Sequence, residues 1–379
     1  MLKVCVYKET GNGRLGGHHT EFAFTGLPGV EVAALADSNP AGKELAGLIG
    51  AKRFYNSYHE MMETEKPDIV VLCSRLPFEH YEQIKYALEH NAHVLCEKPL
   101  AENLQQADEL IRLSRQSKCL VQIAHLARFA PTFRKMKDMI QSGEIGRVLT
   151  CYMRGKEDYR GGGEDMLVLG THILDISCWL FGRPLEVFSD IRYQGRPITP
   201  ADTLPTAEPV GPCAGDEILS FYRFPNNVNG IFESRRDVIP NGDQRLGITV
   251  CGTTGSLTIR YTGIRDLRIC RDNPVPVEDD CRFEHVEIPE DEPIPGAEPI
   301  DMKKWNLPNI ASVYFTANNR RAAWNLMQGI LHGEPLRAGI ETAVESLEMI
   351  SGAYQSSLQR RVVTLPLEDR TQPLMQKEN

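Results

Sequence analysis

A glutamate, a lysine and a proline follow an apolar run at residues 92–96 and form the sequence Glu97-Lys98-Pro99. Lysine carries a charge and proline cannot donate a ladder hydrogen bond, so neither suits the interior of a buried strand. The exit of a strand is also where an open α/β sheet exposes groups to a ligand. We therefore expect Lys98 to stand at a ligand site.

A glycine string at residues 161–163 opens a segment that carries two further groups able to do chemistry, His172 and Asp175. These two residues are three positions apart in a stretch with helical periodicity, so they share one helix face. An imidazole titrates near neutral pH and can move a proton to or from a bound hydroxyl. Tyr159 and Arg160, which precede the glycines, are candidates for substrate contact.

A G-x-G-x-x-G motif occupies residues 11–16, after the first expected strand. Such glycines let the backbone approach a pyrophosphate, and a helix beginning within residues 17–24 would point its amides at that anion. Asp37 ends the second expected strand, where a carboxylate accepts hydrogen bonds from an adenosine ribose and repels a 2′-phosphate. The pattern predicts NAD in preference to NADP. The segment Lys8-Glu9-Thr10 departs from the usual pattern. It separates the strand from Gly11, whereas the usual turn begins directly at the strand end.

The elements that position these groups alternate between strand and helix in the first third of the chain. Near-continuous apolar runs predict strands of a parallel sheet covered on both faces: residues 2–7, 30–36, 68–74, 92–96 and 120–124. Helical patterns lie between them, one of them opened by a capping box at Ser57 and Glu60. This alternation predicts a doubly wound α/β Rossmann sheet.

After about residue 126 the pattern changes to a helix at 131–141, a helix at 165–180 and a series of strands between about 186 and 285. Strands that follow one another with little helix between them predict a mostly antiparallel open sheet in a second, α+β domain. Two helices close the chain. We expect an NAD-binding domain at residues 1–126 and a substrate-binding and oligomerisation domain at residues 127–379.

Bulk composition excludes several classes of protein. The formal net charge is −9 over 379 residues, which argues against a general nucleic-acid binder because phosphate contacts need a basic face. The ten cysteines show neither CxxC pairs nor zinc-like spacing, so buried reduced thiols are expected. No apolar run approaches the roughly 18 residues that a membrane span needs. The composition favours a soluble cytoplasmic protein with no membrane partner.

Together these motifs resemble the Gfo/Idh/MocA oxidoreductases, the relatives of glucose–fructose oxidoreductase and inositol dehydrogenase. The order and spacing of the motifs over most of the chain carry the resemblance: the glycine motif with His19, Asp37, the Glu97-Lys98-Pro99 strand end, Arg128-Phe129, and residues 161–163 followed by Gly170-x-His172-x-x-Asp175.

The resemblance implies an enzyme that binds NAD(P) in its first domain and a sugar or cyclitol over the sheet of its second. Lys98 would contact the reacting oxygen and His172 would act as general acid/base. Oxidation of a secondary alcohol requires the hydroxyl proton to leave, which an imidazole can accept. A lysine beside a nicotinamide cation should have a lowered pKa and can steady a developing alkoxide.

The expected contacts fall into two sets. Cofactor contacts are assigned to the glycine loop and to polar groups at strand ends: Gly11, Gly13, Arg14, Leu15, Gly16, Asp37, Ser38, Ser74, His80, Glu97 and Lys98. Substrate contacts are assigned to the catalytic pair and to polar residues near it: Lys98, Arg128, Tyr159, Arg160, Asp165, His172 and Asp175. His125, which ends the fifth expected strand, is a further possible neighbour of cofactor or substrate.

One departure from the family pattern lies on the second-domain helix. The family commonly places an aspartate four residues before the histidine, where this chain has Val168. Asp165, seven residues before His172, or Asp175 could orient the imidazole or bind a substrate hydroxyl instead. Glu164 and Asp165 with His172 and Asp175 could alternatively hold a divalent metal, but no metal is expected.

Three functions remain open at this stage. The leading hypothesis is an NAD-dependent dehydrogenase of a sugar, cyclitol or glycoside hydroxyl. The second is a glycoside-cleaving enzyme in which tightly held NAD oxidises the sugar transiently and permits elimination. The third is a non-catalytic nucleotide-binding sensor or partner subunit. In each case the resemblance implies a homodimer or homotetramer formed through the C-terminal sheet, because an exposed antiparallel face must be covered.

Overall fold

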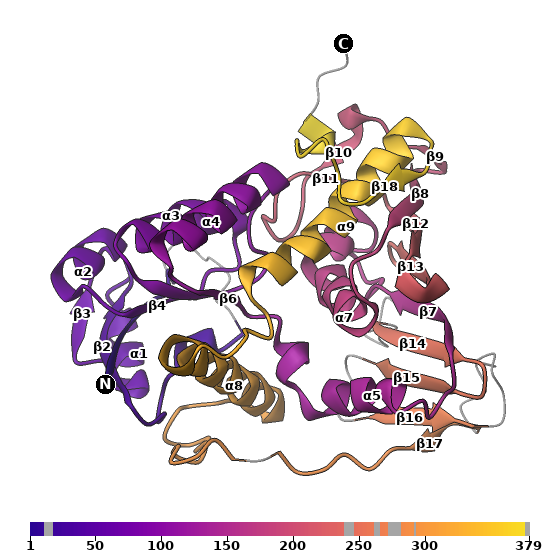
Figure 1. Ribbon diagram of the computed structural model, residues 1–379. Coiled ribbons are helices and arrows are strands. Elements are labelled where there is room, and N and C mark those ends of the chain that lie inside the picture. Colours follow the sequence, from indigo (N-terminus) through magenta and orange to yellow (C-terminus); the bar gives the residue numbers. More distant parts are fainter. Residues whose placement is uncertain (11–17, 239–245, 261–265, 272–281, 292, 376–379) are drawn as a thin grey trace. The chain divides into compact units, whose positions relative to one another are not determined.

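The computed structural model describes residues 1–379 except 11–17, 239–245, 261–265, 272–281, 292 and 376–379. The predicted contacts Gly11, Gly13, Arg14, Leu15 and Gly16 lie outside the described residues. The chain divides into two compact units (Figure 1). The first unit joins three stretches of the chain: Met1–Glu102, Gln106–Phe129 and Glu292–Ala343. The second joins the remaining three: Asn103–Gln105, Ala130–Asp291 and Val344–Asn379.

Six parallel strands form the sheet of the first unit in the order β3-β2-β1-β4-β5-β6. The strands have these bounds: β1 (Leu2–Tyr7), β2 (Val30–Ala36), β3 (Arg53–Tyr55), β4 (Ile69–Leu72), β5 (His93–Cys96) and β6 (Val121–Ile123). Every residue of β4 is buried, as expected for a strand covered on both faces. The strand order reverses between β1 and β4, which places a ligand crevice at the carboxyl ends of the strands. The predicted doubly wound Rossmann sheet is confirmed.

Helices connect these strands with local signals that the sequence contains. Their bounds are α1 (Gly42–Ile49), α2 (Tyr58–Glu65), α3 (Pro77–Glu89) and α4 (Leu104–Ser117). The Ser57 hydroxyl accepts a hydrogen bond from the Glu60 amide at 3.4 Å and caps α2. Proline at the first turn of α3 fits a position whose amide has no helical partner. The edge strand β3 was not predicted, since it is only three residues long and begins with an exposed arginine.

The first unit also contains residues 292–343, whose helix α8 spans Ile310–His332. Trp305 and Leu326 are buried in the same apolar cluster as Val4 and Leu35 of the sheet. The predicted domain boundary at residues 126 and 127 assigned this segment to the other domain, so the compact units divide the chain differently. The physical reason lies near the N-terminus, where the turn that precedes β2 is shorter than the predicted helix and covers less of the sheet.

The helix predicted to begin within residues 17–24 is a single 3₁₀ turn, η2 (Thr20–Phe22), in the described part of that stretch. A three-residue turn offers little apolar surface. Phe22 of this turn stacks on Trp305, with ring centroids 6.0 Å apart. Apolar side chains from the distant 292–343 segment therefore complete the core that a full helix would otherwise cover.

The second unit contains a mixed, mostly antiparallel sheet in the order β17-β16-β15-β14-β7-β13-β12-β8-β18, with β9 paired to β8. Its strands have these bounds: β7 (Val148–Arg154), β8 (Glu186–Tyr193), β9 (Arg196–Pro197), β12 (Glu217–Arg223), β13 (Asn229–Arg235), β14 (Gly247–Gly252), β15 (Ser256–Arg260), β16 (Leu267–Cys270), β17 (Glu284–His285) and β18 (Val363–Thr364). A separate pair is formed by β10 (Thr203–Leu204) and β11 (Cys213–Ala214). The prediction of an antiparallel α+β domain is confirmed, although β7, a central strand parallel to β13, was missed.

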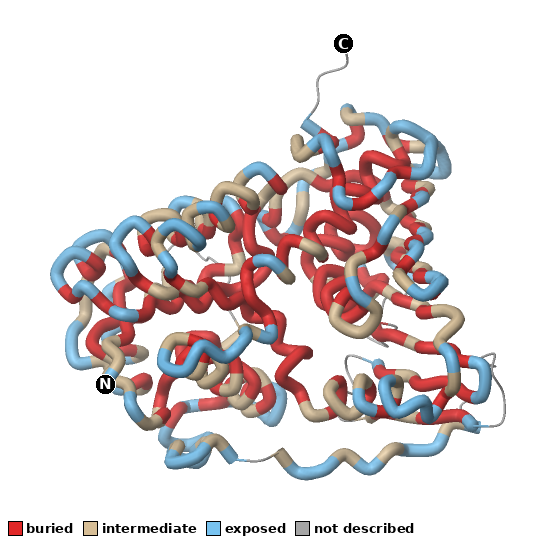
Figure 2. Tube along the Cα trace, viewed as in Figure 1, coloured by how far each residue is buried: buried red, intermediate tan, exposed pale blue. Residues whose placement is uncertain are grey.

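Helices cover one face of this sheet. They are α5 (Pro131–Gln141), α6 (Gly163–Asp165), the π-helical turn η4 (Met166–Gly170), α7 (Thr171–Phe181) and α9 (Ile340–Gln359), with the short turns η3 (Leu126–Phe129), η5 (Pro200–Asp202), η6 (Pro225–Asn227) and η9 (Pro373–Met375) elsewhere. The hydroxyls of Ser356 and Ser357 on α9 accept hydrogen bonds from the amides of Ser189 and Ile191 on β8, both at 3.0 Å. In Figure 2 the buried residues, in red, alternate with intermediate and exposed ones along several of these strands.

Two further expectations concern burial. Each cysteine that the structure describes is buried and carries a free thiol, as the sequence predicted. No helix in the described part of the chain is long and apolar enough to cross a bilayer.

The glycine string at residues 161–163 is required by close backbone packing. A Cβ on Gly161 would lie closer than 3.0 Å to the carbonyl oxygen of Arg235, and a Cβ on Gly162 would also lie closer than 3.0 Å to that of Gly215. Gly162 also has φ 89°, a conformation that side-chain-bearing residues rarely adopt. The string therefore lets the chain enter α6 directly against the ends of β12 and β13.

We predict that Gly162→Ala destabilises the protein by roughly 2–5 kcal/mol, because it combines backbone strain with a steric clash. Gly211→Ala is the matched control, since Gly211 has φ 101° but no atom near the added Cβ, and we expect it to cost about 1–2 kcal/mol. Chemical denaturation of both variants measures the difference. Equal losses would show that the close approach at Gly162 contributes nothing.

Candidate active site

Glu97 and Lys98 follow β5 directly and are both buried. The Glu97 carboxylate accepts hydrogen bonds from the His18 amide, at 3.1 Å, and from the Thr20 hydroxyl. Burial acts to raise the pKa of Glu97, but the hydrogen bond and charge of His18, the charge of Lys98 and the Thr20 hydroxyl hold that pKa at about 2. Glu97 is thus a fixed anion that ties residues 18–20 to the sheet.

Lys98 is only 2% exposed, although it lies at the carboxyl edge of a Rossmann sheet. A buried ammonium costs solvation free energy, which the adjacent Glu97 carboxylate offsets. Buried ionisable groups at such an edge are common at functional sites. A buried lysine at this edge is consistent with the predicted role of Lys98, whereas a lysine that merely ends a strand would be solvated.

His80 was predicted to contact the cofactor, but its ring is fully buried within the protein. Nδ1 lies 2.6 Å from the carbonyl oxygen of Pro99, and Nε2 lies 2.8 Å from that of Ser74. Burial lowers the pKa of His80. The imidazole therefore links the loop after β4 to the loop after β5 from inside the protein.

Ser74 starts the same loop and is also largely buried. Its hydroxyl accepts a hydrogen bond from the Leu76 amide at 3.2 Å, which shapes the turn into α3.

Asp37 follows β2 as predicted, but none of its surface is exposed. Its Oδ1 accepts hydrogen bonds from the amides of Asn39, at 2.8 Å, and Thr10, at 3.1 Å. Its Oδ2 accepts one from the Thr10 hydroxyl. Both oxygens of the carboxylate predicted to bind the ribose are thus hydrogen-bonded within the protein. The neighbouring Ser38 is exposed, and its hydroxyl donates to the Glu9 carboxylate.

Arg128 lies in η3 and was predicted to contact substrate. The structure instead buries it and directs Nη1 to the carbonyl oxygen of Arg337, at 2.9 Å. This bond attaches η3 to the segment between α8 and α9 within the first unit. His125 is buried close by, two residues after β6.

In the second unit, His172 and Asp175 both lie on α7 and are buried. Their three-residue spacing within a regular helix places them on one face, as predicted. Val168 lies in the preceding π turn, η4, and is buried. A π turn holds more residues than an α turn, so spacings counted across it no longer give the faces of a regular helix.

Asp165 precedes that π turn and is fully buried. Its Oδ2 accepts hydrogen bonds from the Ser234 hydroxyl, at 2.6 Å, and from the Glu157 amide, at 3.1 Å. Burial raises the pKa of Asp165. These bonds attach the helix start to β13, and the π turn breaks the seven-residue relation to His172 on which the prediction depended.

Arg160 was a candidate for substrate contact but is buried between two carboxylates. Its guanidinium lies 2.8 Å from Asp158 and 2.6 Å from Glu208. The Glu164 carboxylate accepts hydrogen bonds from the backbone amides of Glu208, at 2.9 Å, and Ala207, at 3.0 Å. The loop between β10 and β11 is thereby fixed to the residues on either side of the glycine string.

Tyr159 is different, because 62% of its surface is exposed. The Arg160 guanidinium lies over the Tyr159 ring, with its central carbon 5.3 Å from the ring centroid. Among the predicted substrate contacts it is therefore open to a ligand without any rearrangement.

Sequence reasoning missed Glu157, a fully buried residue between β7 and the glycine string. Burial, together with the charges of Glu233 and Asp165, raises its pKa to about 7 even though Arg154 is near. No sequence signal marked this glutamate, because its neighbours come from three separate elements.

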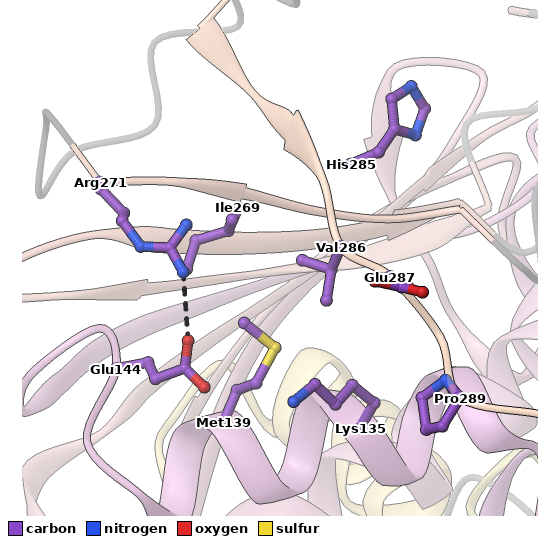
Figure 3. Close-up of a pocket in the computed structure, with 9 residues that line it drawn as sticks. All are labelled: Lys135, Met139, Glu144, Ile269, Arg271, His285, Val286, Glu287 and Pro289. Atoms are coloured by element: carbon purple, nitrogen blue, oxygen red, sulfur yellow. Dashed lines mark hydrogen bonds and ion pairs between the residues drawn. The ribbon is translucent and has the colours of Figure 1, made fainter.

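A cavity of about 550 Å³ lies between α5 and the strands β16 and β17 (Figure 3). None of the described residues predicted for the site lines it. Two of its lining side chains have acidic partners, since Arg271 lies 3.3 Å from Glu144 and the His285 ring lies 2.6 Å from Asp266. Within the described ranges, no group of three or more His, Cys, Asp or Glu side chains is arranged to hold a metal ion.

Two family models match the chain and together cover well over half of it. The NAD-binding Rossmann fold of the GFO/IDH/MocA oxidoreductase family matches residues 10–125, and the C-terminal domain of the same family matches residues 133–258. The chain belongs to the GFO/IDH/MocA family. It is therefore an oxidoreductase whose first domain binds NAD.

Individual relatives are distant. The chain is 25% identical to the uncharacterized oxidoreductase YrbE of Bacillus subtilis, over 68% of this chain and 74% of that protein. It is 25% identical to myo-inositol 2-dehydrogenase of Thermotoga maritima, over 57% of this chain but only 63% of that enzyme. Levoglucosan dehydrogenase in complex with NADH and L-sorbose shares the fold with a TM-score of 0.74, 18% identity, and coverage of 97% of this chain and 100% of that chain.

We predict that Glu97 contributes stability that depends on pH. Its pKa is lower in the folded protein, about 2, than the ordinary 4.5, so the contribution is complete above pH 4.5 and is lost as the pH falls toward 2. A shift of this size corresponds to on the order of 3 kcal/mol. The free energies of unfolding of the wild type and Glu97→Gln should differ most at neutral pH and converge between pH 4.5 and 2. A difference independent of pH would contradict this assignment.

Proposed function

We propose that this protein oxidises a secondary hydroxyl of a sugar, cyclitol or glycoside, with NAD supplying the hydride acceptor. The observation that carries the proposal is Lys98, a buried lysine beside a buried carboxylate at the carboxyl edge of the Rossmann sheet. Such an edge is where ligands bind in folds of this strand order. The family model for NAD binding includes this position.

Lys98 places its positive charge at the substrate oxygen that becomes an alkoxide as its proton leaves. A preorganised cation in a buried site stabilises such developing charge without having to reorganise solvent. Glu97 keeps the segment at residues 18–20 attached beside Lys98 and balances its charge when no substrate is present.

His172 takes the hydroxyl proton and returns it in the reverse reaction. Its place in the first turn of α7, with Asp175 one turn later on the same face, suits an imidazole oriented by its own helix. Val168 stands where the family usually has an aspartate, and Asp165 is hydrogen-bonded to Ser234. Asp175 is therefore the carboxylate proposed to assist His172 or to bind a neighbouring substrate hydroxyl.

Relatives support a polyol substrate. The curated relatives include an inositol 2-dehydrogenase of Mycolicibacterium smegmatis, 29% identical over 52% of this chain, and a D-glucoside 3-dehydrogenase of Escherichia coli, 28% identical over 41% of this chain. These matches span only 58% and 48% of the two relatives. Among the predicted contacts, exposed Tyr159 offers a ring face for a sugar.

The test is NAD reduction with a panel of inositols, free sugars and alkyl glucosides. We predict that Lys98→Ala and His172→Ala each lower kcat/KM by at least about 100-fold, the usual size of a lost acid–base or charge-stabilising group. Lys303→Ala and His59→Ala, which change the same residue types at exposed positions, should leave kcat/KM unchanged.

Two outcomes would contradict the proposal. Turnover that survives both active-site substitutions would show that Lys98 and His172 lack these roles. Cleavage of a glycoside without accumulation of NADH would indicate transient oxidation followed by elimination.

We also propose that the outer face of the second-unit sheet pairs with a second copy of the chain. Phe188 and Phe221 lie directly opposite each other on β8 and β12 and are 42% and 44% exposed. Ile231 and Tyr152 continue this row across β13 and β7. Adjacent apolar side chains on an uncovered sheet face are typical of an interface between subunits.

We predict that Phe221→Glu dissociates the oligomer, because it places a charge at the centre of this row. Leu331→Glu is the matched control, since Leu331 is an exposed apolar residue on α8 of the first unit. Sedimentation velocity compares the two variants with the wild type. A monomeric wild type, or an oligomer unaffected by Phe221→Glu, would contradict the proposal.

A further inference from the structure

Another cavity, of about 430 Å³, lies at the amino-terminal edge of the Rossmann sheet. Its walls are the loop that precedes β2, the start of β2, the end of α1 and the segment that precedes α8, all of them in the first unit. The cavity reaches Val30, the first residue of β2, whereas the ligand crevice of such a sheet lies at the carboxyl ends of its strands. The seven residues of β2 span roughly 20 Å. The cavity is therefore separate from the cofactor crevice.

Much of the lining of this cavity is apolar. Each wall contributes apolar side chains, among them Phe24, Leu27, Val30, Leu48 and Trp305. The charged side chains of the lining are paired with each other, since Lys52 lies 2.8 Å from Glu31 and Lys304 lies 2.8 Å from Glu298. A pocket of this volume, mostly apolar and with few polar groups, is typical of a site for a small molecule.

Trp305 brings a hydrogen-bond donor to the lining. The residue is 1% exposed, and its indole Nε1 has no acceptor among the residues that the structure describes. A buried donor without an acceptor costs about 1–3 kcal/mol, and an indole N–H can act only as a donor. A phenylalanine would fill the same apolar surroundings without that cost. The indole nitrogen therefore indicates an acceptor that is supplied from the cavity.

The Arg320 guanidinium lies over the same indole ring, with its central carbon 5.2 Å from the ring centroid. Arg320 is 5% exposed, and its Nη2 donates to the carbonyl oxygens of Glu298, at 2.8 Å, and Gly26, at 3.2 Å, two residues of the lining. Within the described ranges this guanidinium forms no ion pair with a carboxylate, and its Nε also lacks an acceptor. A buried cation in such surroundings favours a negatively charged neighbour.

We propose that this cavity binds a small carboxylic acid with an apolar body, whose carboxylate accepts a hydrogen bond from Trp305 Nε1 in the field of Arg320. Both groups without an acceptor are N–H donors, and an ionised carboxylate is acceptor-only. Hydrogen bonds to an ionised partner are about twice as strong as neutral ones. The apolar body of the ligand packs against Leu27 and Leu48. This site is independent of NAD and of the proposed reaction.

The test is isothermal titration calorimetry of the purified full-length protein with sodium octanoate, and with 1-octanol as its neutral match. Octanoate should bind saturably, and saturating NADH should leave its Kd unchanged, because the cofactor crevice lies at the other edge of the sheet. 1-Octanol should bind at least about tenfold more weakly, since it places no negative charge near Arg320.

Two substitutions in the lining locate the binding. Trp305→Phe keeps an aromatic ring but removes the donor, and should raise the Kd for octanoate about tenfold, the value expected for loss of a charge-assisted hydrogen bond. Trp324→Phe is the matched control, because Trp324 is a tryptophan of α8 outside the lining, and its Kd should stay within about twofold of the wild type. Leu48→Trp enlarges a partly exposed side chain of the lining and should abolish binding. It decides the question if Trp305→Phe does not fold.

Three outcomes would overturn the inference. The first is a wild type that binds no octanoate, or binding that both lining substitutions leave within about twofold. The second is competition between octanoate and NADH, which would place the carboxylate in the cofactor crevice. The third is equal affinity for octanoate and 1-octanol, which would show an apolar pocket with no preference for a carboxylate.

Discussion

A carboxylate buried at the end of β5 organises the ligand edge of the first unit. Glu97 is charged, almost fully buried and bonded to the amide and hydroxyl of the segment that follows the glycine motif. Removing one partner of such a group leaves a buried charge without compensation, which is far costlier than losing a surface contact. The Glu97 carboxylate binds Thr20 at the start of η2, and it also accepts a hydrogen bond from the backbone amide of Lys98 at 3.3 Å. His80 reinforces the same edge by linking the loops after β4 and β5.

In the second unit, buried carboxylates also hold segments in place, through hydrogen bonds from a hydroxyl and from backbone amides. Asp165 and Glu164 use their carboxylates as acceptors for a strand hydroxyl and for backbone amides, so the start of the helix that carries His172 is fixed to the sheet and to a loop. The glycines at 161–163 permit that approach, because any side chain there would meet backbone carbonyl groups. In both units, acidic residues that the sequence suggests as ligand contacts are bonded to segments that they hold in place.

Much of the fold could be predicted because its signals are local. The strands at residues 2–7 and 30–36 and the helix at 131–141 agree with prediction to the residue. Two features differ from the prediction. The central strand β7 was missed although its residues, VLTCYMR, favour a strand. The assignment of α8 has a non-local cause, since α8 belongs to the first unit because its apolar face is buried there. No local pattern states which of two sheets a distant helix will cover.

The sequence by itself determined the family and the Rossmann and antiparallel sheets, since residue order and periodicity express these directly, and it predicted Lys98 and His172 as the catalytic pair. Only the tertiary structure decided what each polar side chain does. Asp37, Arg128, Arg160 and Asp165 have the residue types of a binding site, yet each is buried and bonded within the protein. The physical reason is that a hydrogen-bonding group has the same chemistry in any setting, and its accessibility depends on neighbours contributed by distant parts of the chain.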